Sequence, residues 1–394
     1  MVEYKLSEKQ LGLQKSAKDF AETELKPVAQ EFDRKTNPCE CFPSEVYAKS
    51  VERGFQGIYV PQEYGGLGLG DFEAALVFEE IGAADAGFGS ALCISAAISQ
   101  GIIHFGTKDQ KESWLPKIAR KGDCVLGFGV TEYGAGSEAY VANADPKVGL
   151  QTTSRLEGKD YIVNGRKHFI SNGGVGKLYG LATRSTMDRP MFETITIFMV
   201  DEATPGFRIG KIEDKMGQRL MLNGELIFEN ARVPLENRLG EEKQGAGVMV
   251  DVACSTTVTI GATMVGLARA AYEAAHQYAL KRISGGQPLI NHEAISLLLA
   301  DMKIGIESAR ALLWQVAWMN DNVRRDYPQS AMVKVYCAEV AKMATNHALQ
   351  IHGGFGYMRD SGPIEKYVRD ATVATIYDGT GEVLKQWVSG SQHF

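Results

Sequence analysis

The sequence contains little cysteine and no excess of positive charge. Only six of its 394 residues are cysteines, and only Cys39 and Cys41 lie close together. Neither a disulfide scaffold nor a zinc site of paired cysteines is expected, and scattered thiols of this kind favour a cytoplasmic location. The 42 Lys and Arg residues against 48 Asp and Glu give a formal net charge of −6, which argues against a nucleic-acid partner.

Targeting and membrane signals are also scarce. The first ten residues contain neither an apolar segment nor an Arg-rich amphipathic stretch, so we expect no signal or transit peptide there. Residues 245–267 are long enough to cross a bilayer and carry one charge, Asp251. Because this segment also contains several Ser and Thr residues, we predict a buried helix of a soluble protein and no membrane insertion.

Several motifs of common enzymes are missing as well. The sequence lacks the phosphate loop G-x-x-x-x-G-K-[ST], a G-x-G-x-x-G fingerprint after a strand, H-E-x-x-H and G-x-S-x-G. These absences argue against a nucleotide hydrolase of the phosphate-loop type and against a Rossmann dehydrogenase.

What is present is a change of apolar periodicity along the chain. Helical spacing begins at a capping box formed by Ser7 and Gln10 and continues to about residue 120. Between 124 and 230, short segments rich in β-branched and aromatic residues predict strands, and Asn164-Gly165 predicts a type I′ hairpin turn.

Helical spacing returns after about residue 240. Asn291 is placed to cap a long helix, and a further helix is expected to end at Gly353, a natural C-terminal signal. Long helices with short connections predict an antiparallel bundle.

Five short segments could carry chemistry, and each also has an ordinary structural interpretation. The loop Val130–Ser137 could admit a ligand or be a plain Gly-rich loop, and Phe169 could face a planar ring or lie in the core. Asp378 could be a general base, although Asp-Gly is also a common turn pair. The glycines of 350–356 could admit a phosphate or only end a helix, and Arg282 could hold an anion or be solvated.

In their order and spacing these motifs resemble those of the acyl-CoA dehydrogenase family. The matching segments are V-T-E-x-G-A-G-S, F-I-S-N-G-G, K-R-x-S-G-G, H-G-G-x-G-Y, V-R-D-A and I-Y-D-G-T. The resemblance covers essentially the whole chain and implies an N-terminal all-α domain (1–123), a middle antiparallel β-barrel or sandwich domain (124–239) and a C-terminal four-helix bundle (240–394). It also implies FAD as cofactor, an acyl-CoA substrate, a homotetramer and an electron-transferring flavoprotein as acceptor.

The resemblance further implies the residues of the site, and no metal. Asp378 is the implied catalytic base. Substrate contacts are implied for Ser137, Thr256, Thr257, Tyr377 and Gly379. FAD contacts are implied for Phe128, Val130, Thr131, Gly136, Ser137, Phe169, Ile170, Ser171, Arg282, Ser284, His292, Gln350, Gly353, Gly354, Thr380 and Glu382.

The sequence departs from the family pattern at several of these positions. Phe169 and Ser171 stand where Trp and Thr are usual, Thr257 stands where Arg is typical, and Glu293 and Glu382 stand where Gln is more usual.

The implied reaction is α,β-dehydrogenation, in which the base removes the α-proton and the β-hydrogen leaves as hydride to flavin N5. The family's base is Glu, so Asp378 withdraws the carboxylate by about 1.5 Å. A misplacement near 1 Å costs on the order of a hundredfold in rate. We therefore predict a cyclic or branched acyl group, such as that of cyclohexane-1-carboxyl-CoA.

Two alternatives remain at this point. Nitroalkane oxidases share the fold and use an Asp base followed seven residues later by Arg, where this chain has Lys385. A non-catalytic subunit that binds flavin or acyl-CoA is the other alternative.

Overall fold

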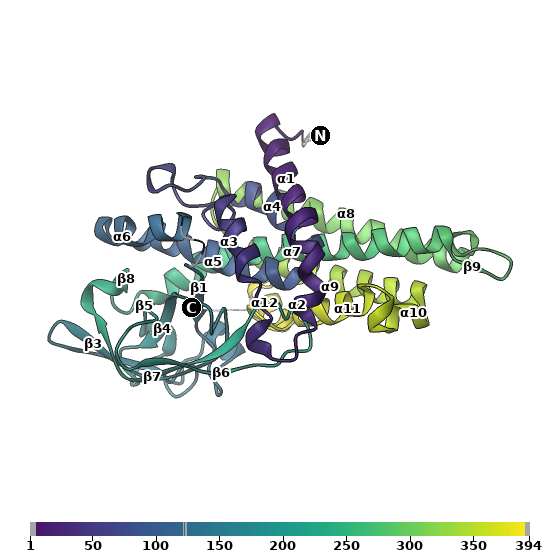
Figure 1. Ribbon diagram of the computed structural model, residues 1–394. Coiled ribbons are helices and arrows are strands. Elements are labelled where there is room, and N and C mark those ends of the chain that lie inside the picture. The colour runs from purple at the N-terminus through teal and green to yellow at the C-terminus, as the bar shows by residue number, and fades with distance from the viewer. Residues whose placement is uncertain (1–4, 121, 123, 391–394) are drawn as a thin grey trace.

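A computed structural model describes residues 5–120, 122 and 124–390, so the predicted domain boundary at residue 123 lies outside the described residues. The first part of the chain is helical (Figure 1). Its helices are α1 (Glu8–Phe20), α2 (Lys26–Asp33), α3 (Ser44–Glu52), α4 (Asp71–Ala84), α5 (Ala86–Phe105) and α6 (Lys108–Arg120). The predicted capping box is confirmed, because the Gln10 amide donates to Ser7 Oγ at 3.3 Å and the Ser7 amide donates to Gln10 Oε1 at 2.9 Å.

The middle of the chain forms one sheet. Its strands are β1 (Leu126–Gly129), β2 (Thr153–Glu157), β3 (Asp160–Ser171), β4 (Leu178–Arg184), β5 (Ile195–Asp201), β6 (Phe207–Ile212), β7 (Asn223–Pro234) and β8 (Arg238–Leu239). Their order is β6-β7-β3-β2-β4-β5-β8, with β1 beside β4. Most neighbours are antiparallel, as expected, but β1 and β2 both pair with β4 in parallel.

The hairpin predicted at Asn164-Gly165 is wrong. The β2–β3 hairpin turns instead at Gly158-Lys159, where Glu157 pairs with Asp160. Asn164 and Gly165 lie inside β3, at a shift of register against β7, and Asn164 Oδ1 accepts from the Asn230 amide at 2.8 Å. A β-bulge therefore uses the same residue pair that the sequence pattern assigns to a turn.

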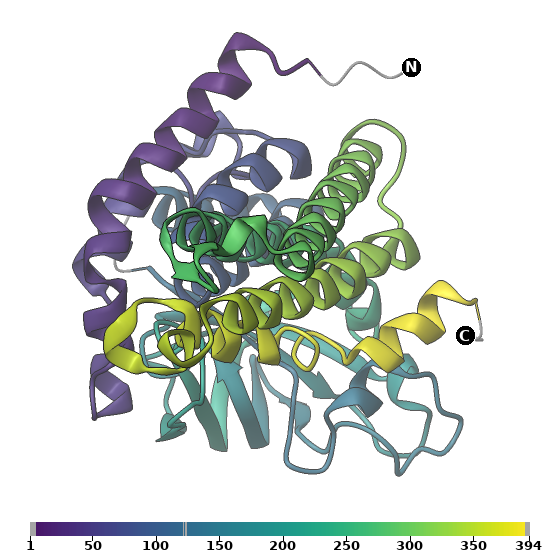
Figure 2. The same ribbon diagram turned by 90° about the vertical axis from the view of Figure 1, so that its right-hand side faces the viewer.

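Strand β4 is buried on both of its faces. Leu178 and Ala182 face a cluster shared with α5, α6 and α7, whereas Tyr179 and Leu181 pack against aromatic residues from the other strands. Figures 1 and 2 show the sheet against one side of the helical layers. The edge of the sheet that carries β1 thus meets the helices.

The last part of the chain is helical again. Its helices are α7 (Gly245–Lys281), α8 (Glu293–Asn322), α9 (Tyr327–His352), α10 (Gly354–Tyr357), α11 (Ile364–Val373) and α12 (Gly381–Val388). Between α7 and α8 a short hairpin of β9 (Ile283–Ser284) and β10 (Gln287–Pro288) projects from the body of the molecule (Figure 1).

The two predicted helix ends have different outcomes. Asn291 does not cap α8, because it lies in a 3₁₀ turn and His292 occupies the N-cap position. The predicted end at Gly353 is confirmed, since this residue has φ +57° and its amide donates to the Leu349 carbonyl at 2.9 Å.

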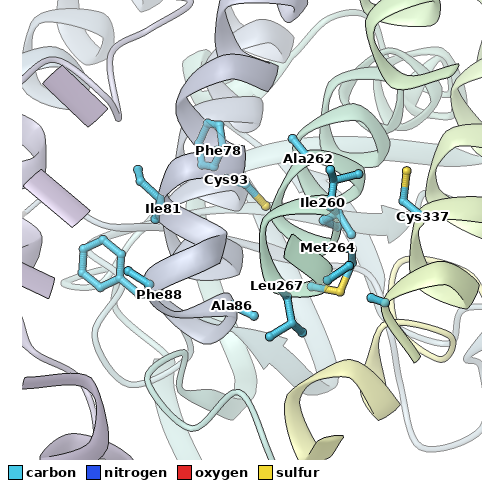
Figure 3. Packing of buried hydrophobic residues seen from close by; sticks show 14 of the residues in the cluster. Phe78, Ile81, Ala86, Phe88, Cys93, Ile260, Ala262, Met264, Leu267 and Cys337 are labelled. Carbon is cyan, nitrogen blue, oxygen red and sulfur yellow. The ribbon is translucent and has the colours of Figure 1, made fainter. Parts of the chain in front are cut away.

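Helix α7 is the central helix of the core. Figure 3 shows its residues Ile260, Met264 and Leu267 in the apolar cluster that also contains Phe78 and Ile81 of α4 and Cys337 of α9. Both α5 and α7 are long and apolar enough to cross a membrane, but 89% of the most apolar window of each is buried inside the protein. Their apolar character is thus accounted for by the core, in agreement with the buried helix predicted for 245–267.

Two glycines allow α4 and α7 to approach closely. A Cβ at Gly82 would lie 2.3 Å from the Thr263 carbonyl oxygen, and a Cβ at Gly266 would lie 2.0 Å from the Glu79 carbonyl oxygen. These are backbone contacts, so a side chain at either position forces the helices apart.

We predict that Gly266→Ala lowers the free energy of unfolding by about 2 kcal/mol or more, because the added methyl group overpacks the α4–α7 contact. Urea denaturation followed by circular dichroism measures the change. Gly247→Ala is the matched control on the same helix, because its Cβ meets nothing within 4 Å. Higher helix propensity should stabilise that variant by up to about 1 kcal/mol. Equal effects of the two substitutions would contradict the prediction.

Candidate active site

A cavity of about 700 Å³ lies where the sheet meets the helices. This volume is typical of a site for a small molecule or cofactor. Most of the predicted site residues line it. They are Phe128, Val130, Thr131, Gly136, Ser137, Phe169, Ile170, Ser171, Thr256, Tyr377, Asp378, Gly379 and Thr380.

The remaining predicted residues do not reach this cavity. Thr257 is fully buried, and its hydroxyl donates to the Ala253 carbonyl of its own helix at 2.7 Å. Glu382 is exposed in the first turn of α12. The others, which we call the tip group, are Arg282, Ser284, His292, Gln350, Gly353 and Gly354.

The tip group lies where the hairpin leaves α7 and where α9 ends. Arg282 stands over the Phe355 ring at 5.7 Å, and His292 Nε2 lies 3.0 Å from the Ser284 carbonyl oxygen. From Thr256 at the cavity, α7 runs for 281 − 256 = 25 residues to its end, a length of roughly 38 Å. One chain therefore presents two separate groups of predicted residues.

The mouth of the cavity carries exposed aromatic rings. Phe169 and Tyr133 are 57% and 76% exposed, and the Tyr133 ring stacks on His168 at 3.8 Å. Phe169 adopts φ +58°, and its carbonyl accepts from Asn223 Nδ2 at 2.6 Å. A left-handed backbone at a bulky residue is uncommon and often marks a functional site. Exposed ring faces fit a planar cofactor such as the implied isoalloxazine ring.

The hydroxyl-bearing strand ends beside these rings fit the same cofactor. Thr131 and Ser171 line the cavity, and a Cβ at Gly136 would meet nothing within 4 Å, so a ligand can approach the backbone there. This donor set and the aromatic faces are consistent with a flavin. Among the described residues, no group of three or more His, Cys, Asp or Glu side chains is placed to hold a metal ion.

A buried ion pair fixes the loop that contains Thr131. Lys167 Nζ lies 2.7 Å from Glu132 Oε1 and 3.0 Å from the Val130 carbonyl oxygen. Glu132 also accepts from the amides of Gln151 and Thr152, at 2.6 and 3.0 Å. Burial lowers the pKa of Lys167 to about 8, although Glu132 opposes this shift. The pair thus joins β3 to the loop after β1 at a largely buried position.

The opposite wall holds Asp378 in a tight turn. Asp378 and Gly379 have φ of +54° and +83°, and Thr380 then caps α12, accepting from the Val383 amide at 3.4 Å. The turn interpretation of Asp-Gly is therefore right, and the same turn places the Asp378 side chain at the cavity.

A direct hydrogen bond from α7 holds that carboxylate. Thr256 Oγ1 donates to Asp378 Oδ2 at 2.9 Å. Burial raises the pKa of Asp378, while the Lys334 charge and the Thr256 hydrogen bond act in the opposite direction. A carboxylate with a raised pKa is a stronger base than one in water, which suits proton abstraction.

Several lining residues were not predicted. Ser90, Ile94 and Ile98 lie at steps of four on α5 and line one wall of the cavity. This spacing is visible in the sequence. The Ser90 hydroxyl lies 3.3 Å from the Tyr377 hydroxyl. Lys215 also lines the cavity, and burial lowers its pKa to about 7. No sequence pattern singles out Lys215, because its position depends on the loop before β7.

Comparison with known proteins gives matches over nearly the whole chain. The N-terminal, middle and C-terminal domain profiles of acyl-CoA dehydrogenases match residues 7–122, 127–231 and 243–391. The chain is 38% identical to the acryloyl-CoA reductase (NADH) of Anaerotignum propionicum over 98% of this chain and 94% of that protein.

Two solved structures are similar over 99% of both chains, each with a TM-score of 0.92. Butyryl-CoA dehydrogenase from Megasphaera elsdenii is 33% identical. A chain in the structure of the electron transferring flavoprotein of Acidaminococcus fermentans is 34% identical.

We predict that Glu132→Gln lowers the free energy of unfolding by about 3 kcal/mol, because it leaves Lys167 buried without a counter-charge. The pKa of Lys167 should then fall further below about 8. Folding of the variant would therefore require deprotonation of a lysine that stays charged in the wild type below that pH. The loss of unfolding free energy, which we call the deficit, should thus be larger near pH 6 than near pH 8.5.

Urea titrations at these two pH values measure the deficit. Glu112→Gln is the control, because its pairing with Lys108 at 3.6 Å is exposed, and it should change stability by less than about 0.5 kcal/mol. A deficit for Glu132→Gln that does not depend on pH would count against the assigned role of the pair.

Proposed function

Because the chain belongs to the acyl-CoA dehydrogenase family of FAD-dependent oxidoreductases, we propose that it catalyses α,β-dehydrogenation of an acyl-CoA thioester with Asp378 as the base. The observation that carries the proposal is the position of Asp378 in the cavity, bonded to Thr256 of α7. On the same face of α7, Val252 and Ile260 flank Thr256 and also line the cavity. An apolar surrounding of this kind excludes water and strengthens a carboxylate base.

Each group of residues in the cavity then has a role in the proposed reaction. Asp378 takes the α-proton of the thioester, and Thr256 fixes the orientation of its carboxylate. The apolar walls from α5 and α7 hold the acyl group, and the backbone at Gly136 and Ser137 admits the thioester at close range. FAD, when bound, supplies the acceptor for the hydrogen that leaves the β-carbon with its electron pair.

The acyl group is proposed to be compact and substituted at the α-carbon, as in cyclohexane-1-carboxyl-CoA. The chain is similar to proteins that are named for acryloyl and butyryl groups, which are small. Asp378 reaches about 1.5 Å less far than a glutamate. A ring or branch at the α-carbon would shift the reacting carbon toward this shorter base.

The first prediction from this proposal concerns bleaching of the bound flavin. Under anaerobic conditions a compact cyclic or branched thioester should bleach the yellow protein, and Asp378→Asn should slow bleaching by about 10⁴-fold or more, because the amide cannot accept the α-proton. Stopped-flow absorbance with a panel of cyclohexane-1-carboxyl-CoA, isobutyryl-CoA, butyryl-CoA and octanoyl-CoA measures the rates.

The panel, together with an oxygen-consumption assay with nitroethane, also tests the alternatives. Faster bleaching by butyryl- or octanoyl-CoA than by the cyclic thioester would overturn the proposed acyl group but keep the reaction. Oxygen consumption with nitroethane would instead support a nitroalkane oxidase, and thioester binding without bleaching would support a non-catalytic subunit. Asp214→Asn is the matched control, because Asp214 also lines the cavity but is largely exposed and paired with Arg219.

We also propose that the chain forms a homotetramer in which neighbouring subunits complete each FAD site. The roughly 38 Å of α7 between the cavity and the tip group is longer than an extended dinucleotide. The hairpin also projects from the subunit, where a second copy can receive it (Figure 1). The cavity of one subunit would therefore use the tip group of another.

A hybrid experiment tests this arrangement. Oligomers co-expressed from Asp378→Asn and Arg282→Ala chains should regain about a quarter of the wild-type bleaching amplitude, because half of random pairs are mixed and each mixed pair has one intact site. Separately purified variants mixed without exchange are the control. Absence of regained amplitude in verified hybrids would place Arg282 and Asp378 in the same subunit's site.

The acceptor and the location complete the proposal. An electron-transferring flavoprotein as acceptor is supported by the similarity to a chain in the Acidaminococcus structure. A cytoplasmic location is supported by the six cysteines, which form no disulfide in the described part of the chain.

A further inference from the structure

Lys334 on α9 is a charged residue in the core of the protein. Its side chain is fully buried, and its neighbours on the helix, Ala331, Val333 and Cys337, belong to the apolar core. Burial of an ammonium group is costly unless a partner compensates for it. A lysine retained at such a position therefore calls for a physical reason.

Two other lysines, Lys167 and Lys366, have side chains that are nearly fully buried, and both have carboxylate partners. Lys167 pairs with Glu132 at 2.7 Å, and Lys366 pairs with both Asp85 and Asp370. Within the described ranges, no carboxylate lies at salt-bridge distance from Lys334. Its Nζ donates instead to the Gly379 carbonyl oxygen at 2.7 Å.

The contacts of Lys334 converge on the turn that carries Asp378. Besides Gly379 on one side of Asp378, the ammonium group lies 5.8 Å from the centre of the Tyr377 ring on the other side. Asp378 and Gly379 both have positive φ, so the turn has an uncommon backbone that benefits from a fixed partner. The Thr256 hydroxyl holds the carboxylate from the α7 side. Lys334 holds the backbone from the α9 side.

We propose that Lys334 is a positioning residue for the reaction: it anchors the turn through Gly379, and its buried charge keeps the Asp378 carboxylate ionised in the apolar cavity. The inference rests on the proposed role of Asp378 as base. Its electrostatic part is consistent with the pKa directions. Burial lowers the pKa of Lys334 to about 8 while Asp378 and Glu382 oppose this, and the Lys334 charge lowers the pKa of Asp378 against the effect of burial.

Few other charged groups face these two. Glu382 faces Lys334 from α12, and the ionisable groups around Asp378 are Cys93 on α5, Tyr140 before β2, Tyr327 on α9 and the adjacent Tyr377. Burial raises the pKa of each of these four groups, so they stay neutral at ordinary pH. Lys215 and Arg369 also line the cavity, but the charge that lowers the pKa of Asp378 is that of Lys334. Lys334 is thus the cation that the pH dependence of Asp378 should report.

The test uses the flavin-loaded enzyme with Lys334→Met and Lys334→Gln. In Lys334→Met, the acid limb of the pH profile for thioester bleaching should move to higher pH by about one unit or more, because loss of the cation raises the pKa of Asp378. The bleaching rate at pH 7 should fall at least about tenfold, while the dissociation constant of the thioester changes by less than about threefold. Lys334→Gln keeps a donor for Gly379 but no charge. It should show the same shift of the limb with a smaller loss of rate at high pH.

Lys342→Met is the matched control, because Lys342 is exposed on the same helix. It should leave both the limb and the rate unchanged. An unshifted limb in folded, flavin-loaded Lys334→Met and Lys334→Gln would overturn the charge role. An unchanged rate at high pH in Lys334→Met would overturn the anchoring role.

A second measurement does not depend on turnover. In a double-mutant cycle of Lys334→Gln and Asp378→Asn, the unfolding equilibrium constants should differ from additivity by about fivefold or more. Additive effects would overturn the inference even if no thioester bleaches the wild type. Failure of the wild type to react with any thioester, with coupling intact, would instead overturn only the proposed function.

Discussion

The backbone contact between α4 and α7 is the constraint on which the rest of the structure depends. Gly82 and Gly266 let the two helices touch without side chains between them, and this fixes α7 at the centre of the molecule. One part of α7 then presents Thr256 to the cavity, and its far end carries the hairpin with Arg282. Helix α5 follows α4 directly, and the Asp85 side chain between them accepts from the Phe88 amide at 2.8 Å. The contact between α4 and α7 therefore also fixes the position of α5 and of the cavity wall that contains Ser90.

The two sides of the cavity use buried lysines differently. On the side of the aromatic rings, Lys167 and Glu132 neutralise each other, and their pair acts as a rigid support for the loop after β1. On the other side Lys334 bonds to the Gly379 carbonyl and, among the described residues, has no carboxylate at salt-bridge distance. Its charge therefore acts on the nearby Asp378. Lys167, which is paired with a carboxylate, therefore stabilises the shape of the site. Lys334, which has no carboxylate partner, contributes a positive electrostatic potential to it.

Much of this architecture could be predicted from the sequence, for reasons that specific residues show. Signals that act within one turn, such as the Ser7 capping box, appear as expected because their partners lie a few residues away. Asn164-Gly165 has the sequence of a hairpin turn, but pairing with the distant strand β7 makes it a β-bulge. The sequence does not predict that Thr257 points away from the cavity or that Lys334 lies beside it. The side of a buried helix that faces a site is set by packing against distant segments. The order of helical, β and helical parts depends on periodicity alone and was predicted correctly.

The position of the turn at 377–380 has a consequence for how the molecule is made. The cavity walls from α5 and α7 leave the ribosome long before this turn and α12, and α12 is then held against the middle of the chain by Trp387 Nε1, which donates to the Tyr140 carbonyl at 2.9 Å. Until this last segment docks, the cavity that Ile94 and Ile98 line lacks the wall that residues 377–380 supply. During synthesis the unfinished chain therefore has an incomplete apolar cavity. Growing chains at this stage are most prone to aggregate or to recruit a chaperone. Docking of the C-terminal segment therefore completes the active site and ends this stage in one step.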